Sequence, residues 1–162
     1  MHRRLSTLCN SLKRKGRMQI LQVLLLAGIA ANAYSQVPAR PEIVQVRAVI
    51  DGDTIDVAGA GRIQLAGIRA PRTTRATGDG EPFGRQARER LEGMLTPRFV
   101  RLEFPGASRS SACVLLEDGT FVNALLVREG LARLSGRLTG PRGDELRRAE
   151  ESARTARRGI WR

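Results

Sequence analysis

The stretch VQVRAVIDGDTIDVAGAGRIQLAGI, residues 44–68, decides the fold because apolar residues alternate with others through three short segments. The first segment ends at the turn signal Asp51-Gly52, and a second strand is predicted over Thr54–Val57. The glycine-rich loop at residues 58–61 leads into a third predicted strand, Arg62–Ile68. These short connections predict a three-stranded meander. The apolar positions that define the first strand are Val44, Val46, Ala48 and Ile50.

Beyond the meander, the chain is predicted to add a helix, two strands and two helices. Apolar residues three and four apart predict a helix over Phe83–Leu95, and alternation or apolar runs predict strands over Arg98–Phe104 and Ala112–Glu117. Helices are predicted over Val122–Glu129, which Gly130 follows, and over Asp144–Arg158. Five strands with a helix between the third and fourth indicate the α+β class and an OB-fold, a five-stranded Greek-key barrel, with three helices.

The N-terminal segment has the layout of a secretory signal. Six basic side chains and no acidic one precede the apolar run from Ile20 to Ala31, which is shorter than the roughly 20 residues of a membrane-spanning helix. Small residues favour cleavage after Ala33 or Ser35. We therefore expect a signal peptide over residues 1–35, a short linker over 36–42 and one domain over 43–162. The protein would then be secreted or periplasmic, with no membrane span left after signal removal.

The composition beyond residue 35 excludes several kinds of chemistry. This part of the chain has no histidine and no lysine, so a histidine general base and lysine amine chemistry are both excluded. Cys113 is its single cysteine, which rules out an internal disulfide or a cysteine zinc cluster and predicts a buried structural thiol. The remaining Asp, Glu, Arg, Ser and Thr suit hard-cation chemistry on phosphates or plain anion binding.

The charge balance beyond residue 35 also indicates a class of partner. This part contains 22 basic and 16 acidic side chains, a net charge of +6, against +12 for the whole chain. A GC-rich genome would also explain why all the basic side chains are arginines, but the charge acts whatever its origin. A domain of this charge attracts polyanions such as nucleic acid, or an anionic membrane surface.

Several separated motifs resemble the staphylococcal nuclease, or thermonuclease, family. They occur in the family's order over nearly the whole chain after the signal. The resemblance implies an OB barrel with three helices, often secreted, whose active members use calcium to cut DNA and RNA. The motifs are Asp51-Gly52-Asp53-Thr54, QLAGIRAPR at residues 64–72, Pro82-Phe83-Gly84, DGTFVN at 118–123, LVREGLA at 126–132 and Gly159-Ile160-Trp161.

The resemblance also implies which positions would carry the chemistry, and most of them are substituted. Asp53 matches the family's first metal-binding aspartate. The second metal aspartate and the catalytic glutamate fall at Arg69 and Arg72. The two catalytic arginines fall at Gln64 and Ser110. We therefore assign no catalytic residue.

Two arginines in place of carboxylates argue against calcium, because each fixed positive charge opposes a nearby divalent ion by about 1 kcal/mol or more. We expect no cofactor, and Ca²⁺ only if the site is rebuilt. Asp79 and Glu81 are candidates to restore carboxylates, and Arg62 and Arg109 to replace the lost arginines. Asp53 has two open interpretations, a metal ligand or ordinary turn chemistry.

Three classes of function remain open at this point. The favoured one is a catalytically impaired nuclease homologue, a pseudoenzyme that binds nucleic acid or another phosphate polyanion through Arg62, Arg69, Arg72 and Arg109. The alternatives are an active metal-dependent endonuclease with a rearranged site, and an envelope protein-interaction module that keeps the barrel for its surface. The sequence leaves the oligomeric state open.

Overall fold

The computed structural model describes residues 41–73 and 80–162, which belong to one compact unit, Ala39–Arg162. The predicted signal peptide, residues 1–35, lies outside the described residues, as do most of the predicted linker and Asp79. Among the described residues, no helix is both long and apolar enough to cross a membrane.

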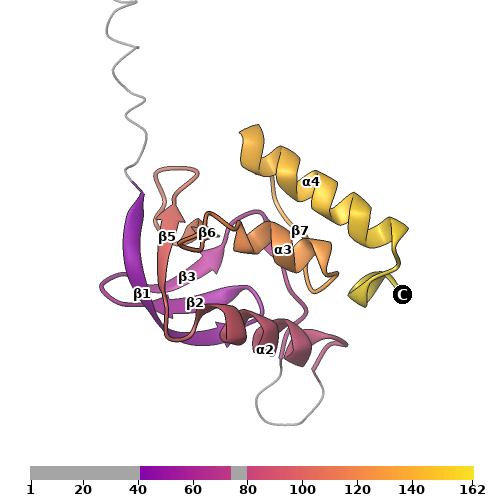
Figure 1. Ribbon diagram of the computed structural model, residues 1–162, viewed down its shortest axis with the longest axis horizontal. Coiled ribbons are helices and arrows are strands. Elements are labelled where there is room, and N and C mark those ends of the chain that lie inside the picture. Colours follow the sequence, from indigo (N-terminus) through magenta and orange to yellow (C-terminus); the bar gives the residue numbers. More distant parts are fainter. Residues whose placement is uncertain (1–40, 74–79) are drawn as a thin grey trace, which may run out of the picture. The chain divides into compact units, whose positions relative to one another are not determined.

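Five strands close into a barrel, in the order β1-β2-β3-β6-β5 (Figure 1). Strands β3 and β6 pair in parallel, and the other neighbours are antiparallel. The predicted α+β class and five-stranded OB barrel are confirmed. The barrel strands are β1 (Glu42–Asp51), β2 (Thr54–Val57), β3 (Gly61–Leu65), β5 (Phe99–Glu103) and β6 (Ser111–Leu115).

The alternation read from the sequence places one face of β2, β3 and β5 inside the barrel, whereas in β1 register irregularities after Val46 bury Val49 in place of Ala48 and Ile50. Ile55 and Val57 of β2 are fully buried, and Val100 and Leu102 of β5 are buried in the same core. Cys113 of β6 is also buried, as predicted, and burial raises the pKa of its thiol to about 11. A negative charge at Glu103 adds to this shift, and the positive charge of Arg142 opposes it.

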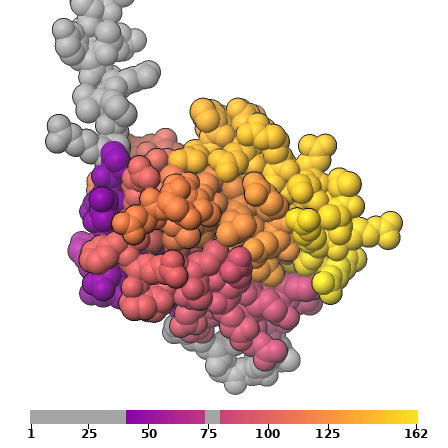
Figure 2. Space-filling model, in the orientation of Figure 1, coloured from indigo at the N-terminus to yellow at the C-terminus, as the bar shows by residue number. Residues whose placement is uncertain are grey.

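Within residues 41–73 and 80–162, three α-helices cover the barrel: α2 (Gly84–Leu95), α3 (Val122–Arg128) and α4 (Gly140–Thr155). Helix α2 buries Ala87, Leu91 and Leu95 and packs against β1. Helix α3 packs against β6 and α4, and Figure 2 shows the surfaces of α3 and α4 meeting on one face. A short 3₁₀ helix, η2 (Gly159–Trp161), ends the chain.

The third predicted strand, Arg62–Ile68, is wrong as a single element. Strand β3 ends at Leu65, and Gly67 adopts a left-handed backbone with φ of 75°, which an extended strand cannot contain. The chain then forms a separate strand, β4 (Ile68–Arg69), which pairs with β7 (Arg133–Leu134) in a two-stranded sheet. This break directs the residues after Gly67 away from the barrel.

Other boundaries of the last helix and of β1 also differ from the prediction. The last helix begins at Gly140 and not at Asp144, because Pro141 lies in its first turn, where a missing N–H group removes no helical hydrogen bond. That helix ends at Thr155, before the predicted Arg158. Strand β1 begins at Glu42, the last residue of the predicted linker.

A fully buried asparagine joins the elements around the β3–β4 turn. The Val114 N–H donates to Oδ1 of Asn123 over 3.0 Å, and Nδ2 of Asn123 donates to the Ala66 carbonyl over 2.9 Å. A longer contact of 3.4 Å runs from the same Nδ2 to the Ala112 carbonyl. Because these bonds satisfy the buried amide, Asn123 holds α3, β6 and the turn before β4 together.

Candidate functional site

The Asp51-Gly52-Asp53 turn holds the loop that follows β4. The Ala70 N–H donates to Oδ2 of Asp53 over 3.1 Å, and the Thr54 hydroxyl donates to Oδ1 over 2.9 Å. Oδ1 of Asp51 accepts from both the N–H and the hydroxyl of Thr73, over 3.3 and 3.0 Å. The two aspartates thus fix the loop at Ala70 and at Thr73.

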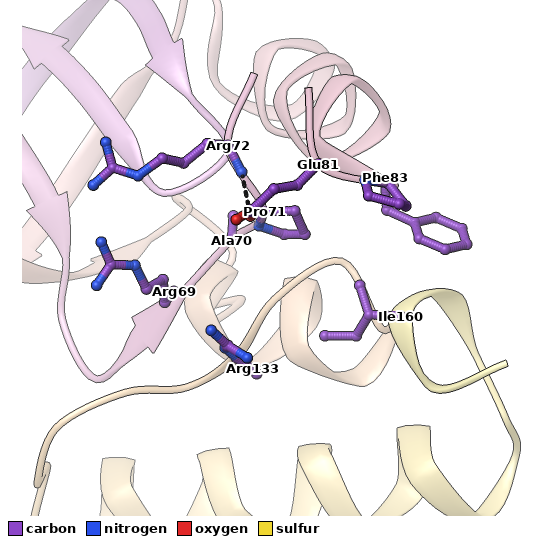
Figure 3. Close-up of a pocket in the computed structure, with 9 residues that line it drawn as sticks. Arg69, Ala70, Pro71, Arg72, Glu81, Phe83, Arg133 and Ile160 are labelled. Carbon is purple, nitrogen blue, oxygen red and sulfur yellow. Dashed lines mark hydrogen bonds between the residues drawn. The ribbon is translucent and has the colours of Figure 1, made fainter. Parts of the chain in front are cut away.

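A hollow of about 510 Å³ opens beside this loop (Figure 3). In Figure 3 the guanidinium groups of Arg69, Arg72 and Arg133 lie on one side, and the side chains of Phe83 and Ile160 lie on the other. The hollow therefore has a basic side and an apolar side. Its lining consists of Arg69, Ala70, Pro71, Arg72, Glu81, Pro82, Phe83, Arg133 and Ile160.

Two of these arginines face each other directly across a sheet. Arg69 of β4 is the register partner of Arg133 of β7. Like charges directly opposite one another destabilise a strand pair. Within residues 41–73 and 80–162, no ion pair involves Arg69, Arg72 or Arg133. An anion placed between the two guanidinium groups would offset this repulsion.

Among the described residues that line the hollow, Glu81 is the one with a carboxylate. Its Oε2 accepts from the Arg72 N–H over 2.9 Å, and its own N–H donates to the Arg72 carbonyl over 3.0 Å. This reciprocal pair ties the loop to the segment before α2. A Cβ atom at Gly84 would lie 2.5 Å from the Arg72 carbonyl oxygen, so only glycine permits the approach. Phe83, between them, has a left-handed backbone with φ of 70°.

The structure places the positions of the family's catalytic arginines elsewhere. Gln64 lines a different groove. The Gln64 N–H donates to the Ser110 carbonyl over 2.9 Å, so these two positions meet through the backbone. Neither residue belongs to the lining of the arginine hollow.

The two arginines considered as replacements do not line the hollow either. Arg62 lies on β3 opposite Asp56 of β2. Arg109 pairs with Glu42, and its guanidinium carbon lies 4.5 Å from the centre of the Phe104 ring. The structure therefore brings together two of the four predicted phosphate-binding arginines, Arg69 and Arg72.

The described carboxylates nearest the hollow, Asp53 and Glu81, are already engaged in hydrogen bonds. Calcium takes six to eight oxygen ligands. Asp53 is only 8% exposed, and each of its oxygens accepts a hydrogen bond from the protein. In the part of the chain that the structure describes, no three acidic, histidine or cysteine side chains gather as a metal site. The side chains placed at the hollow suit an anion instead.

Sequence reasoning missed Arg133, which lines the hollow through the pairing of β4 with β7. A two-residue strand is too short to show a periodic pattern, so the sequence did not predict the pairing of β4 with β7. One clue was available, because Arg133 directly follows the family-like segment that ends at Ala132.

The closed OB barrel and the order of the motifs along the chain place this protein in the class of OB-fold domains of the nuclease type. A model described as Staphylococcal nuclease homologue matches residues 62–162. The chain is 33% identical over 139 residues to a thermonuclease of Staphylococcus intermedius, covering 78% of this chain and 80% of that protein. It is 30% identical over 167 residues to protein ParB of Escherichia coli, covering 93% and 88%. It is 29% identical over 167 residues to a micrococcal nuclease of Shigella flexneri, covering 87% and 86%.

The chain therefore belongs to the staphylococcal nuclease homologue family. Membership supports a function of the nuclease type, related to nucleic acid.

Proposed function

We propose that this protein is an exported, catalytically impaired nuclease homologue that binds nucleic acid or another phosphate polyanion through its arginine hollow. The observation that carries the proposal is the direct pairing of Arg69 with Arg133 across β4 and β7, with Arg72 lining the same hollow. The proposal keeps Arg69 and Arg72 from the sequence prediction and adds Arg133.

Arginine alone suffices for this binding. A guanidinium group donates two parallel hydrogen bonds to a phosphate, and no metal is needed. The hydrogen bonds to Asp53 and Asp51 hold the backbone at Ala70 and Thr73. Arg69 and Arg72 are the chain neighbours of these two residues, so their backbone is held in place. Phe83 and Ile160 add an apolar side against which a sugar or base can rest. The net charge of +6 beyond residue 35 raises the local concentration of any polyanion.

Impairment of catalysis is inferred from the groups that the family chemistry requires. Removing a single transition-state donor typically lowers the rate by about 10² to 10³. Here the resemblance places substitutions at Gln64, Arg69, Arg72 and Ser110. The effects of several such losses, with no calcium bound, would bring hydrolysis close to the uncatalysed rate.

The binding half of the proposal is tested by fluorescence anisotropy with a labelled single-stranded oligonucleotide. The triple variant Arg69→Ala, Arg72→Ala, Arg133→Ala is expected to bind at least about 10-fold more weakly at low salt. The slope of log K against log salt concentration is expected to become less negative by about 2, since each of three lost phosphate contacts contributes about 0.7 for a single strand.

The matched control removes three exposed arginines elsewhere, Arg148, Arg157 and Arg162, and so loses the same charge. The control is expected to keep most of the affinity. Equal losses in both triple variants would show that net charge binds the strand and the hollow does not. Competition with inorganic polyphosphate separates general polyanion binding from a preference for nucleic acid.

The catalytic half is tested by a cleavage assay on single-stranded DNA with calcium or with a chelator. We expect no cleavage above background in either condition. Calcium-dependent cleavage that disappears in Glu81→Gln would overturn the impairment and establish a rebuilt site at the carboxylate that bonds to the Arg72 N–H.

A further inference from the structure

A second surface of the barrel carries features that the arginine hollow does not explain. Ile43 and Phe99 are 72% and 64% exposed, and they are the large hydrophobic side chains that the described residues leave most open to solvent. In the β1–β5 register, Gln45 faces Phe99 and Ile43 faces Arg101. Ile43 and Phe99 are therefore diagonal neighbours on the outer wall of the barrel.

These residues surround a depression of about 740 Å³ on the wall formed by β1 and β5, which lie side by side in Figure 1. The depression shares no lining residue with the arginine hollow. We call this surface the β1–β5 wall. Its lining consists of Pro41, Ile43, Arg98, Phe99, Val100, Arg101, Leu116 and Glu117.

Charge decides what kind of partner the β1–β5 wall fits. Arg98 and Arg101 are accompanied by Glu117, and Asp118 is the next residue in the chain. None of these four takes part in an ion pair within the described ranges 41–73 and 80–162. The lining holds two arginines and one glutamate, and Asp118 adjoins it, so both signs of charge surround an apolar centre.

A surface of this kind matches a copy of itself. In a two-fold dimer the same patch meets itself, so it must be self-complementary in shape and charge. We propose that the β1–β5 wall is the interface of a homodimer, with Phe99 and Ile43 at its centre. The arginines of one copy then face the acidic residues of the other, in particular Arg101 opposite the partner's Glu117.

The first experiment measures the oligomeric state by sedimentation equilibrium of the purified protein at increasing concentration. The expected result is a reversible dimer with a dissociation constant of about micromolar, the weak end for a small patch. Phe99→Ser and Ile43→Ser are each expected to weaken the dimer about 30-fold or more, since central aromatic and aliphatic anchors dominate such interfaces. Arg148→Glu, an exposed change on α4, serves as the control.

The second experiment is a charge exchange. Arg101→Glu and Glu117→Arg are each expected to weaken dimerisation, because each places like charges together across the two-fold axis. The double variant is expected to restore it, because the pair is then reversed in both copies. Circular dichroism and melting curves check that every variant is folded.

Three outcomes would overturn the proposal. They are a wild-type protein that stays monomeric at all concentrations, a double variant that is not restored, and a dimer that persists in Phe99→Ser. If the wild type is monomeric and Phe99→Ser loses oligonucleotide affinity, the wall is a nucleic-acid surface instead. The triple variant of the arginine hollow is expected to dimerise normally, so this proposal and the proposed function fail independently.

Discussion

Asp53 shows how one residue of a family motif takes its meaning from its neighbours. The sequence allowed a metal ligand or a turn residue at this position. The hydrogen bonds from Thr54 and Ala70 give the turn interpretation a physical basis, since they occupy an oxygen each. The sequence identified Arg69 and Arg72 as candidate phosphate-binding residues, but it did not identify Arg133 as the strand partner of Arg69.

At the same scale, Cys113 predicts how stability depends on alkaline pH. Its buried thiol has a pKa raised to about 11 from 9.0, so the unfolded chain loses this proton first as the pH rises. The stabilisation is therefore fully present below pH 9 and is lost as the pH rises through about 11. The expected loss is about 2 to 3 kcal/mol in the free energy of unfolding, measured by urea denaturation from pH 8 to pH 11.

Few other groups of this chain interfere with that measurement. Beyond residue 35 it has no lysine and no tyrosine, so no other side chain titrates in this range. In Cys113→Ala the alkaline loss is expected to disappear, although the variant starts from a lower stability. An unchanged pH dependence in that variant would contradict the prediction.

At the scale of elements, alternation and turn signals located most strands to within one or two residues. Strand β2 was predicted at Thr54–Val57 and lies there. The short strands were missed because tertiary pairing leaves no local pattern. The pairing of β4 with β7 joins residues more than 60 positions apart, and the same pairing brings Arg133 to the hollow.

For the β4–β7 pair we predict that one substitution raises stability and lowers the affinity for an oligonucleotide. Arg133→Gln removes a like charge opposite Arg69 and is expected to raise the stability of the free protein by about 0.2 to 1 kcal/mol. The same change is expected to weaken oligonucleotide binding several-fold, because a charged donor is lost. Thermal melting at low salt and anisotropy measure the two effects. Arg148→Gln, on the exposed face of α4, should change neither, and a stability loss in Arg133→Gln would refute the account.

For the molecule as a whole, element order was enough to predict the OB barrel, because few arrangements close five strands with a helix between the third and fourth. The motifs were enough to predict the family. They were not enough to predict how the hollow is lined, since Phe83, Ile160 and Arg133 come from three distant segments.

Export is the prediction that belongs to this scale. Expression in a host with a secretory pathway is expected to give a protein that begins after Ala33 or Ser35, found outside the cytoplasm. Intact mass and N-terminal sequencing of the purified protein measure this. An unprocessed chain that remains in the cytoplasm would contradict it.

The two aspartates that hold Ala70 and Thr73 have a kinetic consequence. Because the loop is in place before a ligand arrives, little conformational entropy is lost when a ligand docks. Encounter then needs no prior opening step, and the association rate is set by diffusion and by the attraction of the arginines. Such a rate rises in proportion to ligand concentration without levelling off, and it falls as ionic strength increases.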